Sequence, residues 1–260
     1  MGTGAITSYI DVAQIALYAF WVFFAGLIYY LHREDKREGY PLESDRSGGR
    51  IKVQGWPSVP EPKAYLLRDG RVVMSPNFRV SNQVLGGTPS VNHLGAPLEP
   101  NGDPMLAAVG PGSYADRADI ADTTATGDLR IVPLRAAPSF EVAGNDPDPR
   151  GLPVIGADGA VAGTVRDLWV DRAEIVFRYL EVELPPRVVA GTSRRVLLPM
   201  NFTRIGRREV KVRSILAAQF GQVPGTRHPD SVTLLEEDKI MAYYGGGTLY
   251  ATPDRQEPLL

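Results

Sequence analysis

The sequence predicts a single N-terminal transmembrane α-helix followed by a mainly β domain, a small antiparallel barrel, with a C-terminal helix. Three observations lead to this fold class. A run of twenty residues near the N-terminus carries no charged side chain. Short apolar segments separated by turn residues fill the second half of the chain, and a capped helical pattern follows them. We expect four parts, covering residues 1–11, 12–31, 32–105 and 106–260.

The composition is that of a folded protein and excludes several classes of function. Hydrophobic residues make up 43% of the 260 residues and charged residues 22%, which excludes a fully disordered or fibrous chain. The net charge of −2 argues against a nucleic-acid binder. The absence of cysteine excludes disulfides, thiolate metal sites and cysteine nucleophiles. His32, His93 and His228 lie far apart, so we expect neither a histidine metal site nor a histidine-based triad.

The uncharged run covers 12–31 and predicts a membrane anchor. Twenty residues at ~1.5 Å each span about 30 Å, the thickness of the hydrocarbon core. A cleaved signal peptide would need a basic start and a small-residue cleavage site, but the first ten residues have no basic side chain and the run ends in Tyr29, Tyr30 and Leu31. A buried soluble helix that is apolar on all sides rarely occurs in so small a domain.

Basic residues predict the orientation of this helix. Residues 1–11 contain no lysine or arginine, whereas Arg33, Lys36 and Arg37 follow the span at once. The positive-inside rule therefore places the N-terminus outside and the remainder of the chain in the cytoplasm. Small side chains within 16–26 leave two interpretations open, a plain lipid-facing anchor or a helix packed on other helices of a larger membrane complex.

The segment 32–105 is rich in proline and glycine and has little periodicity. Its clearest local pattern is a small hairpin, Ala64–Leu67 and Arg71–Met74, joined by an Asp-Gly turn. Such a segment is either disordered or spread over the surface of another protein. Its aromatic and apolar content favours the second interpretation.

Alternating apolar segments then predict the strands of the barrel. Turn residues at Ala157–Gly159 and Asp171–Ala173 separate them, and Arg207 and Arg208 are expected at the tip of a further hairpin. Four large apolar side chains are expected in the core: Trp169, Phe177, Tyr179 and Leu180. The expected strands are Leu129–Leu134, Val161–Val170, Ile175–Leu184, Arg195–Met200 and Glu209–Ile215.

A helix is predicted near the C-terminus. Thr233 and Glu236 have the spacing of a capping box, and Leu234, Ile240 and Tyr244 recur at helical spacing. We expect the three glycines at 245–247 to end this helix as a C-cap.

Carboxylates and arginines are the remaining chemistry. The chain has no phosphate-binding loop, no nucleophile elbow and no uninterrupted calcium loop. Two interpretations stay open for the charged groups, a solvated polar surface or interacting acids that relay protons near neutral pH. One group contains Asp116, Asp119, Asp122 and Asp128 with Arg117 and Arg130, and the other contains Asp171, Glu174 and Glu181 with Arg172 and Arg178.

Several strings, taken together, carry a family resemblance that runs from the membrane helix almost to the C-terminus. They are GLIYYL at the end of the span, REDKREGYPLE at 33–43, VGPGSYADRAD at 109–119, DLWVDR at 167–172 and TLLEEDKIMAYYGGGTLYATP at 233–253. The chain closely resembles the H subunit of the photosynthetic reaction centre of purple bacteria.

This resemblance implies an accessory, non-catalytic subunit with one transmembrane helix and a PRC-type barrel. Such a subunit caps and stabilises the L and M subunits on the cytoplasmic side of the intracytoplasmic membrane, with its N-terminus in the periplasm. It binds no pigment; the L and M subunits hold bacteriochlorophyll, bacteriopheophytin, two quinones and a non-haem iron. It conducts protons to the secondary quinone, which leaves as quinol. Membrane lipids, a light-harvesting complex and an electron-donating cytochrome are further partners that the resemblance implies.

The resemblance also assigns the candidate residues. Glu174, three residues after Asp171, matches the acid cluster beneath the secondary quinone, and Arg130 and Arg178 match its basic partners. Asp119 and Asp122 match acidic positions further along the proton path, and Asp128 is a carboxylate that could accept protons where the path begins. Separately from the resemblance, Tyr30 and Arg33 lie at the expected membrane surface, where we expect contact with a phospholipid headgroup.

One departure from the family concerns proton uptake. Some members carry a histidine pair in the segment that matches 124–128, where this chain has Thr124, Thr126 and Asp128. The uptake point is therefore open, since a carboxylate holds its proton less firmly than an imidazole does.

Two other functions are compatible with an anchored barrel. The first is a membrane-tethered PRC-barrel scaffold of an unrelated complex, since such barrels also occur in RNA-processing proteins; the net charge and the lack of a basic stripe count against RNA. The second is a membrane-anchored hydrolase that uses the carboxylates. No nucleophile–base pair in the sequence supports it.

Overall fold

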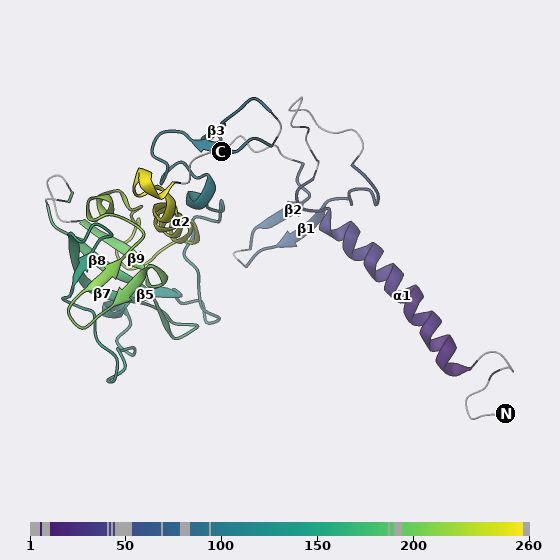
Figure 1. Cartoon of the computed structure of the whole chain (residues 1–260). Coiled ribbons are helices and arrows are strands. Elements are labelled where there is room, and N and C mark those ends of the chain that lie inside the picture. Colours follow the sequence, from purple (N-terminus) through teal and green to yellow (C-terminus); the bar gives the residue numbers. More distant parts are fainter. Residues whose placement is uncertain are drawn as a thin grey trace. The chain divides into compact units, whose positions relative to one another are not determined.

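The computed structural model of the chain (Figure 1) describes residue 6 and residues 11–40, 42, 44, 54–68, 70–78, 84–93, 95–186, 188–189 and 194–256. Its contacts divide the chain into two compact units, Met1–Gln83 and Val84–Leu260. The boundaries predicted at 11/12, 31/32 and 105/106 stay predictions.

The first unit contains a long apolar helix, α1 (Val12–Asp35). Asp11 caps it by accepting the backbone N–H of Gln14 at 2.8 Å, and the Gln14 side chain accepts the N–H of Asp11 in return. Its residues are exposed from Val12 to His32, and only Arg33 and Glu34 near the C-terminal end are partly buried. The helix is long and apolar enough to cross a membrane. It continues four residues beyond the predicted end at Leu31, through a polar turn that ends at Asp35.

Polar contacts connect the C-terminal end of α1 to the segment that follows. The buried Lys36 ammonium donates to the carbonyls of Gln54 and Pro57 at 2.9 and 2.6 Å. Arg37 donates to the carbonyls of Glu61 and Ser75 at 2.7 and 3.0 Å. Lys36 and Arg37, which also support the predicted orientation, thus bind the end of α1 to the segment that follows it.

The predicted hairpin of the first unit is present as β1 (Lys63–Leu66) and β2 (Val72–Ser75). The two strands pair antiparallel, with Ala64 opposite Met74. Gly70 in the turn has φ +82°, a conformation that glycine adopts without strain.

The second unit begins with a short antiparallel pair, β3 (Gly87–Pro89) and β4 (Leu98–Pro100). Its main feature is a seven-stranded sheet with the order β10-β11-β6-β7-β8-β9, in which β5 also pairs with β7. The strands are β5 (Ile131–Pro133), β6 (Pro153–Ile155), β7 (Val161–Asp171), β8 (Val176–Leu184), β9 (Arg194–Pro199), β10 (Thr203–Ile205) and β11 (Val210–Val212). The expected strands and the hairpin with Arg207 and Arg208 at its tip are therefore confirmed.

The sheet differs from the predicted closed antiparallel barrel in two respects. The pair β11–β6 is parallel, and among the described residues the hydrogen-bonded ladder does not close between β9 and β10. Pro199 has no N–H to continue the ladder, and the chain turns there into a 3₁₀ helix, Met200–Phe202, before β10 begins.

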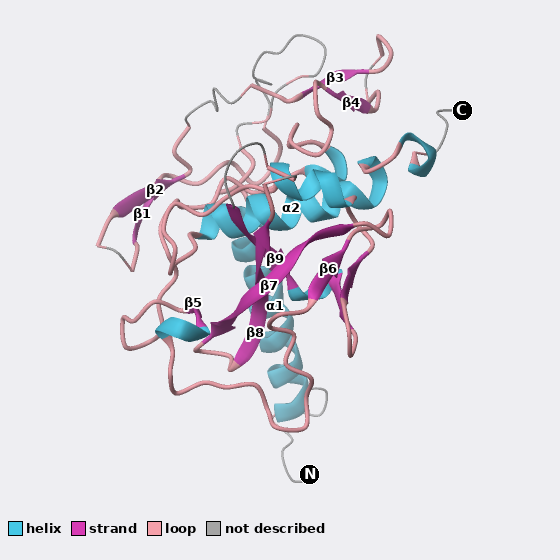
Figure 2. Cartoon of the chain, turned by 90° about the vertical axis from the view of Figure 1, so that its left-hand side faces the viewer, coloured by secondary structure: helices cyan, strands magenta, loops and turns pink. Residues whose placement is uncertain are grey.

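The core lies between the sheet and the helix α2 (Leu234–Tyr250), which Figure 2 shows lying across the sheet. Trp169, Tyr179 and Leu180 are buried, as predicted, whereas Phe177 is only partly buried. From α2, Ile240, Tyr243 and Tyr244 are almost fully buried and supply the other side of this core. The predicted capping box is present, since the Thr233 hydroxyl accepts the N–H of Glu236 at 3.1 Å.

The predicted end of this helix at the three glycines is wrong. The helix runs through Gly245, Gly246 and Gly247 to Tyr250, and at these glycines other backbone segments come close to it. A Cβ at Gly247 would lie 2.6 Å from the carbonyl oxygen of Ser214, and one at Gly246 would lie 3.2 Å from the Cα of Gly112. The glycines therefore serve packing, which a sequence pattern cannot distinguish from a helix stop.

Candidate functional site

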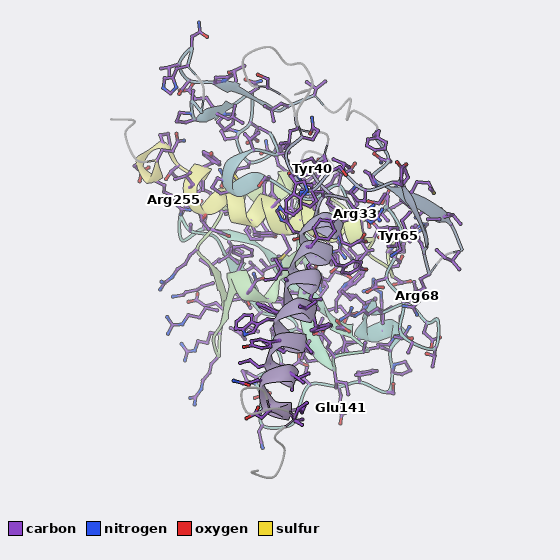
Figure 3. The ribbon with its side chains drawn as sticks, turned by 90° about the vertical axis from the view of Figure 1, so that its right-hand side faces the viewer. Arg33, Tyr40, Tyr65, Arg68, Glu141 and Arg255 are labelled. Atoms are coloured by element: carbon purple, nitrogen blue, oxygen red, sulfur yellow. The ribbon has the colours of Figure 1, made fainter. Side chains whose placement is uncertain are left out.

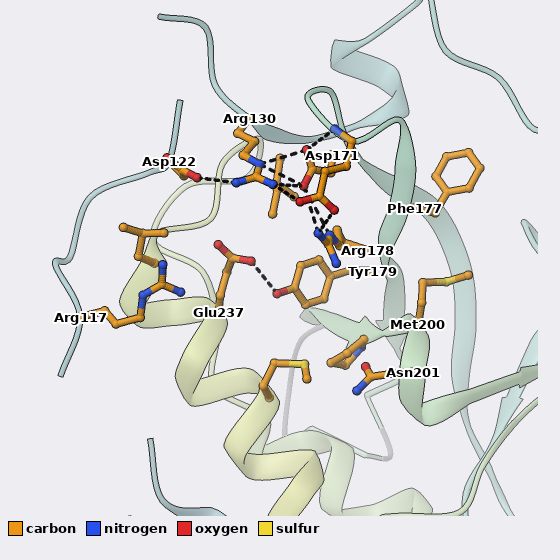
Figure 4. Close-up of a pocket in the computed structure, with 15 residues that line it drawn as sticks. Arg117, Asp122, Arg130, Asp171, Phe177, Arg178, Tyr179, Met200, Asn201 and Glu237 are labelled. Carbon is orange, nitrogen blue, oxygen red and sulfur yellow. Dashed lines mark hydrogen bonds and ion pairs between the residues drawn. The ribbon is translucent and has the colours of Figure 1, made fainter. Parts of the chain in front are cut away.

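An arginine that binds three carboxylates forms the centre of the site. Arg130 directly precedes β5 and donates through Nε to both Asp171 oxygens at 3.1 and 3.0 Å. Its Nη1 donates to Asp122 at 3.0 Å, and its Nη2 forms an ion pair with Glu174. Figure 4 shows Asp122 and Asp171 on either side of the Arg130 guanidinium. The carboxylates raise the pKa of Arg130 above its ordinary value, so it stays charged.

Asp171 is the buried member of this cluster. It is the last residue of β7, and its side chain is 1% exposed. Burial raises its pKa, but the hydrogen bond from Arg130 and the backbone N–H groups of Glu174 and Ala173 outweigh burial, so the net pKa is lowered. Since the same N–H groups form the β7–β8 turn, Asp171 both shapes the turn and stays ionised.

Glu174 is the accessible member. It lies in the β7–β8 turn with a half-exposed side chain, between the guanidinium groups of Arg130 and Arg178. Arg178 on β8 also reaches Asp171 at 3.4 Å. Two arginines therefore hold a buried carboxylate and an exposed one side by side.

A second acid faces the same space from α2. Glu237 accepts the hydroxyl of Tyr179 at 3.0 Å (Figure 4). Burial raises the pKa of Glu237, and the Tyr179 hydrogen bond only partly opposes this rise. Burial also raises the pKa of Tyr179, so the hydroxyl remains a donor. Glu237 thus holds a proton more readily than an ordinary glutamate does.

A cavity of about 590 Å³ connects these groups. At about 30 Å³ per molecule, it has room for many waters that would bridge acids which do not touch. Its lining includes the whole Arg130 cluster, Glu237 and Tyr179, together with Arg117, Ile131, Phe177, Pro199, Met200, Asn201, Leu234 and Met241.

The structure brings together five of the seven residues predicted for proton transfer: Asp122, Arg130, Asp171, Glu174 and Arg178. The other two, Asp119 and Asp128, make their bonds elsewhere. Asp119 accepts the Thr233 hydroxyl at 2.8 Å and pairs with Arg227, and these two hydrogen bonds lower its pKa. Asp128 accepts the Thr126 hydroxyl at 2.8 Å in an exposed loop.

Neither Glu237 nor its hydrogen bond with Tyr179 was predicted from the sequence. The signal was present, because Glu236 satisfies the capping box and leaves the neighbouring Glu237 free for another contact. Tyr179 was predicted only as a core residue. Its hydroxyl lies at the edge of the core, where it meets the helix.

Glu181 does not lie with Asp171 and Glu174, so that part of the predicted grouping is wrong. Its buried carboxylate accepts from Arg135 at 2.7 Å, Arg195 at 3.0 Å and the Trp169 indole at 3.0 Å. Glu181 lies opposite Asp167, well inside the β7–β8 hairpin, whereas Asp171 and Glu174 lie at its turn. The position of Glu181 along β8 therefore separates it from the other two acids. Arg135 also bonds Asp167 and Asp230, so this is a second cluster of three acids around one arginine.

The two residues predicted to touch lipid belong to the first unit. Tyr30 is 54% exposed, and Arg33 is partly buried, with an Nε that finds no hydrogen-bond partner in the part of the chain described. Figure 3 labels Arg33 near Tyr40 at the C-terminal end of α1. Lipid contact stays a prediction. Across the described ranges, no group of three or more histidine or acidic side chains could hold a metal ion.

Two family models match the chain. Residues 4–136 match the photosynthetic reaction centre H-chain N-terminal region, and residues 143–219 match the PRC-barrel domain. The first match covers α1 and ends just after β5, and the second covers the main part of the sheet.

Proposed function

Because this chain belongs to the photosynthetic reaction centre H-chain family, we propose that it caps the L and M subunits and conducts protons to their secondary quinone. Family membership makes it a membrane-associated accessory subunit of the reaction centre, and it implies association with L and M. The pigments, quinones and iron are proposed to lie in those partners. The chemistry that the quinone supplies is the uptake of two electrons and two protons.

One observation carries the proton-transfer proposal. A cavity contains both an acid that stays ionised, Asp171, and an acid that holds a proton more readily, Glu237. Acids whose pKa values are moved in opposite directions can receive and release protons in sequence. Glu174 lies between two arginines at the accessible side of the same cavity, where it can exchange protons with water.

We propose that Glu174 takes up the proton and passes it on, while Arg130 and Arg178 hold its carboxyl group in position. Asp171 holds both arginines in place, since it bonds each of them and is itself buried. Glu237 and the Tyr179 hydroxyl offer the next proton-holding position across the cavity. Capping of L and M rests on the family and on the apolar helix α1, whose exposed surface needs a membrane or other helices.

The test uses reaction centres isolated by means of this chain. Reversible near-infrared bleaching after a flash shows that the complex has assembled. Glu174→Gln keeps the shape of the side chain and removes its proton exchange. We expect the proton-coupled second electron transfer to slow by about a hundredfold, as for loss of one acid–base group, with the first charge separation unchanged.

Glu183→Gln is the matched control. Glu183 lies on β8, the strand that follows Glu174, pairs with Arg166 and is outside the cavity. We expect it to leave both electron transfers unchanged. The proposed role would be contradicted if the second electron transfer kept its rate in Glu174→Gln across the pH range. Loss of the assembled complex in this variant would contradict it too.

A further inference from the structure

The outer surface of the β10–β11 hairpin is strongly basic. Val210 and Val212 point into the core and are 0% and 1% exposed. Because side chains alternate along a strand, Lys211 between them points outward. It lies directly opposite Arg204 on β10. Two like charges in opposed positions destabilise a hairpin. Fold stability therefore does not explain this pair.

The hairpin region concentrates positive charge, whereas the rest of the chain carries more acidic than basic residues. We define the basic patch as Arg204, Arg207, Arg208, Lys211 and Arg213. It holds five of the 28 lysines and arginines but only one acid, Glu209, in a chain whose net charge is −2. Glu209 pairs with Lys211 at 2.9 Å.

The four arginines of the patch differ from the other arginines of this unit. Within the described ranges, none of the four forms an ion pair. Every other described arginine of Val84–Leu260 donates to a carboxylate or a carbonyl. Carboxylate partners bind Arg117, Arg130, Arg135, Arg150, Arg166, Arg178, Arg195 and Arg227, and carbonyl partners bind Arg172, Arg194 and Arg255.

The patch is hollowed. Two adjoining depressions of about 490 and 530 Å³ share Arg204, Lys211 and Arg213 in their lining. The first is also lined by Ser214, which is 4% exposed and whose hydroxyl has no hydrogen-bond partner among the described residues. Arg255, labelled in Figure 3, closes this depression beside the end of α2. Four cations, Arg204, Lys211, Arg213 and Arg255, therefore line the first depression.

We propose that this patch binds the phosphate groups of anionic phospholipids from the membrane in which the chain is anchored. Guanidinium groups match phosphate oxygens with two parallel hydrogen bonds, and four of the five cations are arginines. Clusters of lysine and arginine on a membrane-tethered protein are attracted to anionic headgroups. Since α1 tethers the chain to the bilayer, the lipid is present at high effective concentration.

The test uses the full chain in nanodiscs. The chain has no cysteine, so Thr248→Cys, at an exposed position on the rim of the first depression, gives a single labelling site for a fluorophore. The discs contain a nitroxide-headgroup quencher lipid in phosphatidylcholine alone or in equal parts phosphatidylcholine and phosphatidylglycerol. We expect quenching in the anionic discs only. It should be lost at high salt, where the Debye length falls to about 3 Å.

Two charge-matched variants decide whether the patch is responsible. The patch variant combines Arg204→Gln, Lys211→Gln and Arg213→Gln, and we expect it to lose the quenching. The control combines Arg150→Gln, Arg166→Gln and Arg227→Gln, three arginines whose acidic partners are not buried, and should keep it. Unchanged thermal unfolding of each variant by circular dichroism shows that each is folded.

Three outcomes would overturn the proposal. The first is equal quenching in both disc types or in both variants. The second is displacement by inorganic phosphate but not by chloride at equal ionic strength, which would make free phosphate the ligand. The third is a patch variant that no longer co-purifies with L and M, which would make the patch a protein interface.

Discussion

Two arginines that flank the three-residue strand β5 each bind three carboxylates, yet the two clusters differ in what surrounds them. Arg130 precedes the strand and binds Asp122, Asp171 and Glu174, while Arg135 follows it and binds Asp167, Glu181 and Asp230. In the first cluster, the half-exposed Glu174 and the nearby Glu237 face a cavity of about 590 Å³. The second cluster also lines a cavity, of about 480 Å³, and its Asp230 is 55% exposed, but the central carboxylate of Glu181 is only 3% exposed.

The difference lies in how completely each acid is bonded. Glu181 receives hydrogen bonds from two arginines and the Trp169 indole, so its charge is fixed in one place. Glu174 is bonded by arginines on one side and remains open to solvent on the other. We therefore expect the same charge pattern to serve stability where the acid is fully bonded and the proposed proton exchange where the acid is open to solvent. A count of acids and arginines in the sequence does not separate these cases.

We call the Arg135 cluster closed, because its central acid is buried, and the Arg130 cluster open. The largest expected effect is on stability, in the closed cluster. Glu181→Gln removes a buried charge that holds Arg135 and Arg195, and its amide places a donor against donors. Breaking a buried ion pair in this way costs about 3 kcal/mol of unfolding free energy. Glu174→Gln, at an accessible position, should cost less than about 1 kcal/mol. Thermal unfolding of the full chain in detergent measures both.

This contrast is also a test of the comparison. If both substitutions lowered stability by the same amount, the open and closed clusters would be equivalent. If Glu181→Gln slowed the second electron transfer as Glu174→Gln should, the closed cluster would belong to the proton path.

A smaller effect concerns the pH dependence of stability. Burial raises the pKa of Glu237 above its ordinary value of 4.5, so the folded chain holds this proton more firmly than the unfolded chain does. The stability contribution is then fully present below the unfolded pKa and is lost as the pH rises through the folded pKa. Asp171, whose net pKa is lowered, has the opposite sign: its contribution is lost as the pH falls.

We therefore expect Glu237→Gln to gain stability relative to the parent chain as the pH rises from about 4.5 toward neutral. The measurement is the difference in melting temperature between variant and parent across a pH series. Glu183→Gln serves again as the control. A difference that stays constant with pH would show that the Glu237 carboxyl keeps an ordinary pKa.

Local patterns predicted the elements well but not their packing. The uncharged run predicted α1, and the turn residues predicted the β7–β8 and β10–β11 hairpins, because each of these signals lies within a few neighbouring residues. The parallel pairing of β11 with β6 and the continuation of α2 through Gly247 depend on segments distant in sequence. No local pattern contains that information.

The site was predicted in part for the same reason. Asp171, Glu174 and Arg178 lie within eight residues of one another, so a hairpin places them together. Glu237 comes from a helix more than fifty residues later, and only the fold brings it to Tyr179. Asp119 resembled the other acids by its place in the sequence, but the α2 N-cap residue Thr233 holds it.

The smallest expected effect concerns divalent metals at the solvent side of the open cluster. Asp122 and Arg130 lie at the base of a loop whose far part contains Thr124, Thr126 and Asp128. This loop has no histidine, the preferred nitrogen ligand of zinc. We expect micromolar zinc to leave flash-induced proton uptake, followed with a pH-indicating dye, almost unchanged.

A gain-of-function variant sharpens this prediction. The Thr126 hydroxyl donates to Asp128 at 2.8 Å, so the two side chains are already adjacent. Thr126→His combined with Asp128→His would place two imidazoles where one zinc ion can reach both. We expect zinc to inhibit proton uptake in this variant and not in the parent chain. Inhibition of the parent by micromolar zinc, or no inhibition of the variant, would mean that protons reach the Arg130 cluster by a route that does not pass this loop.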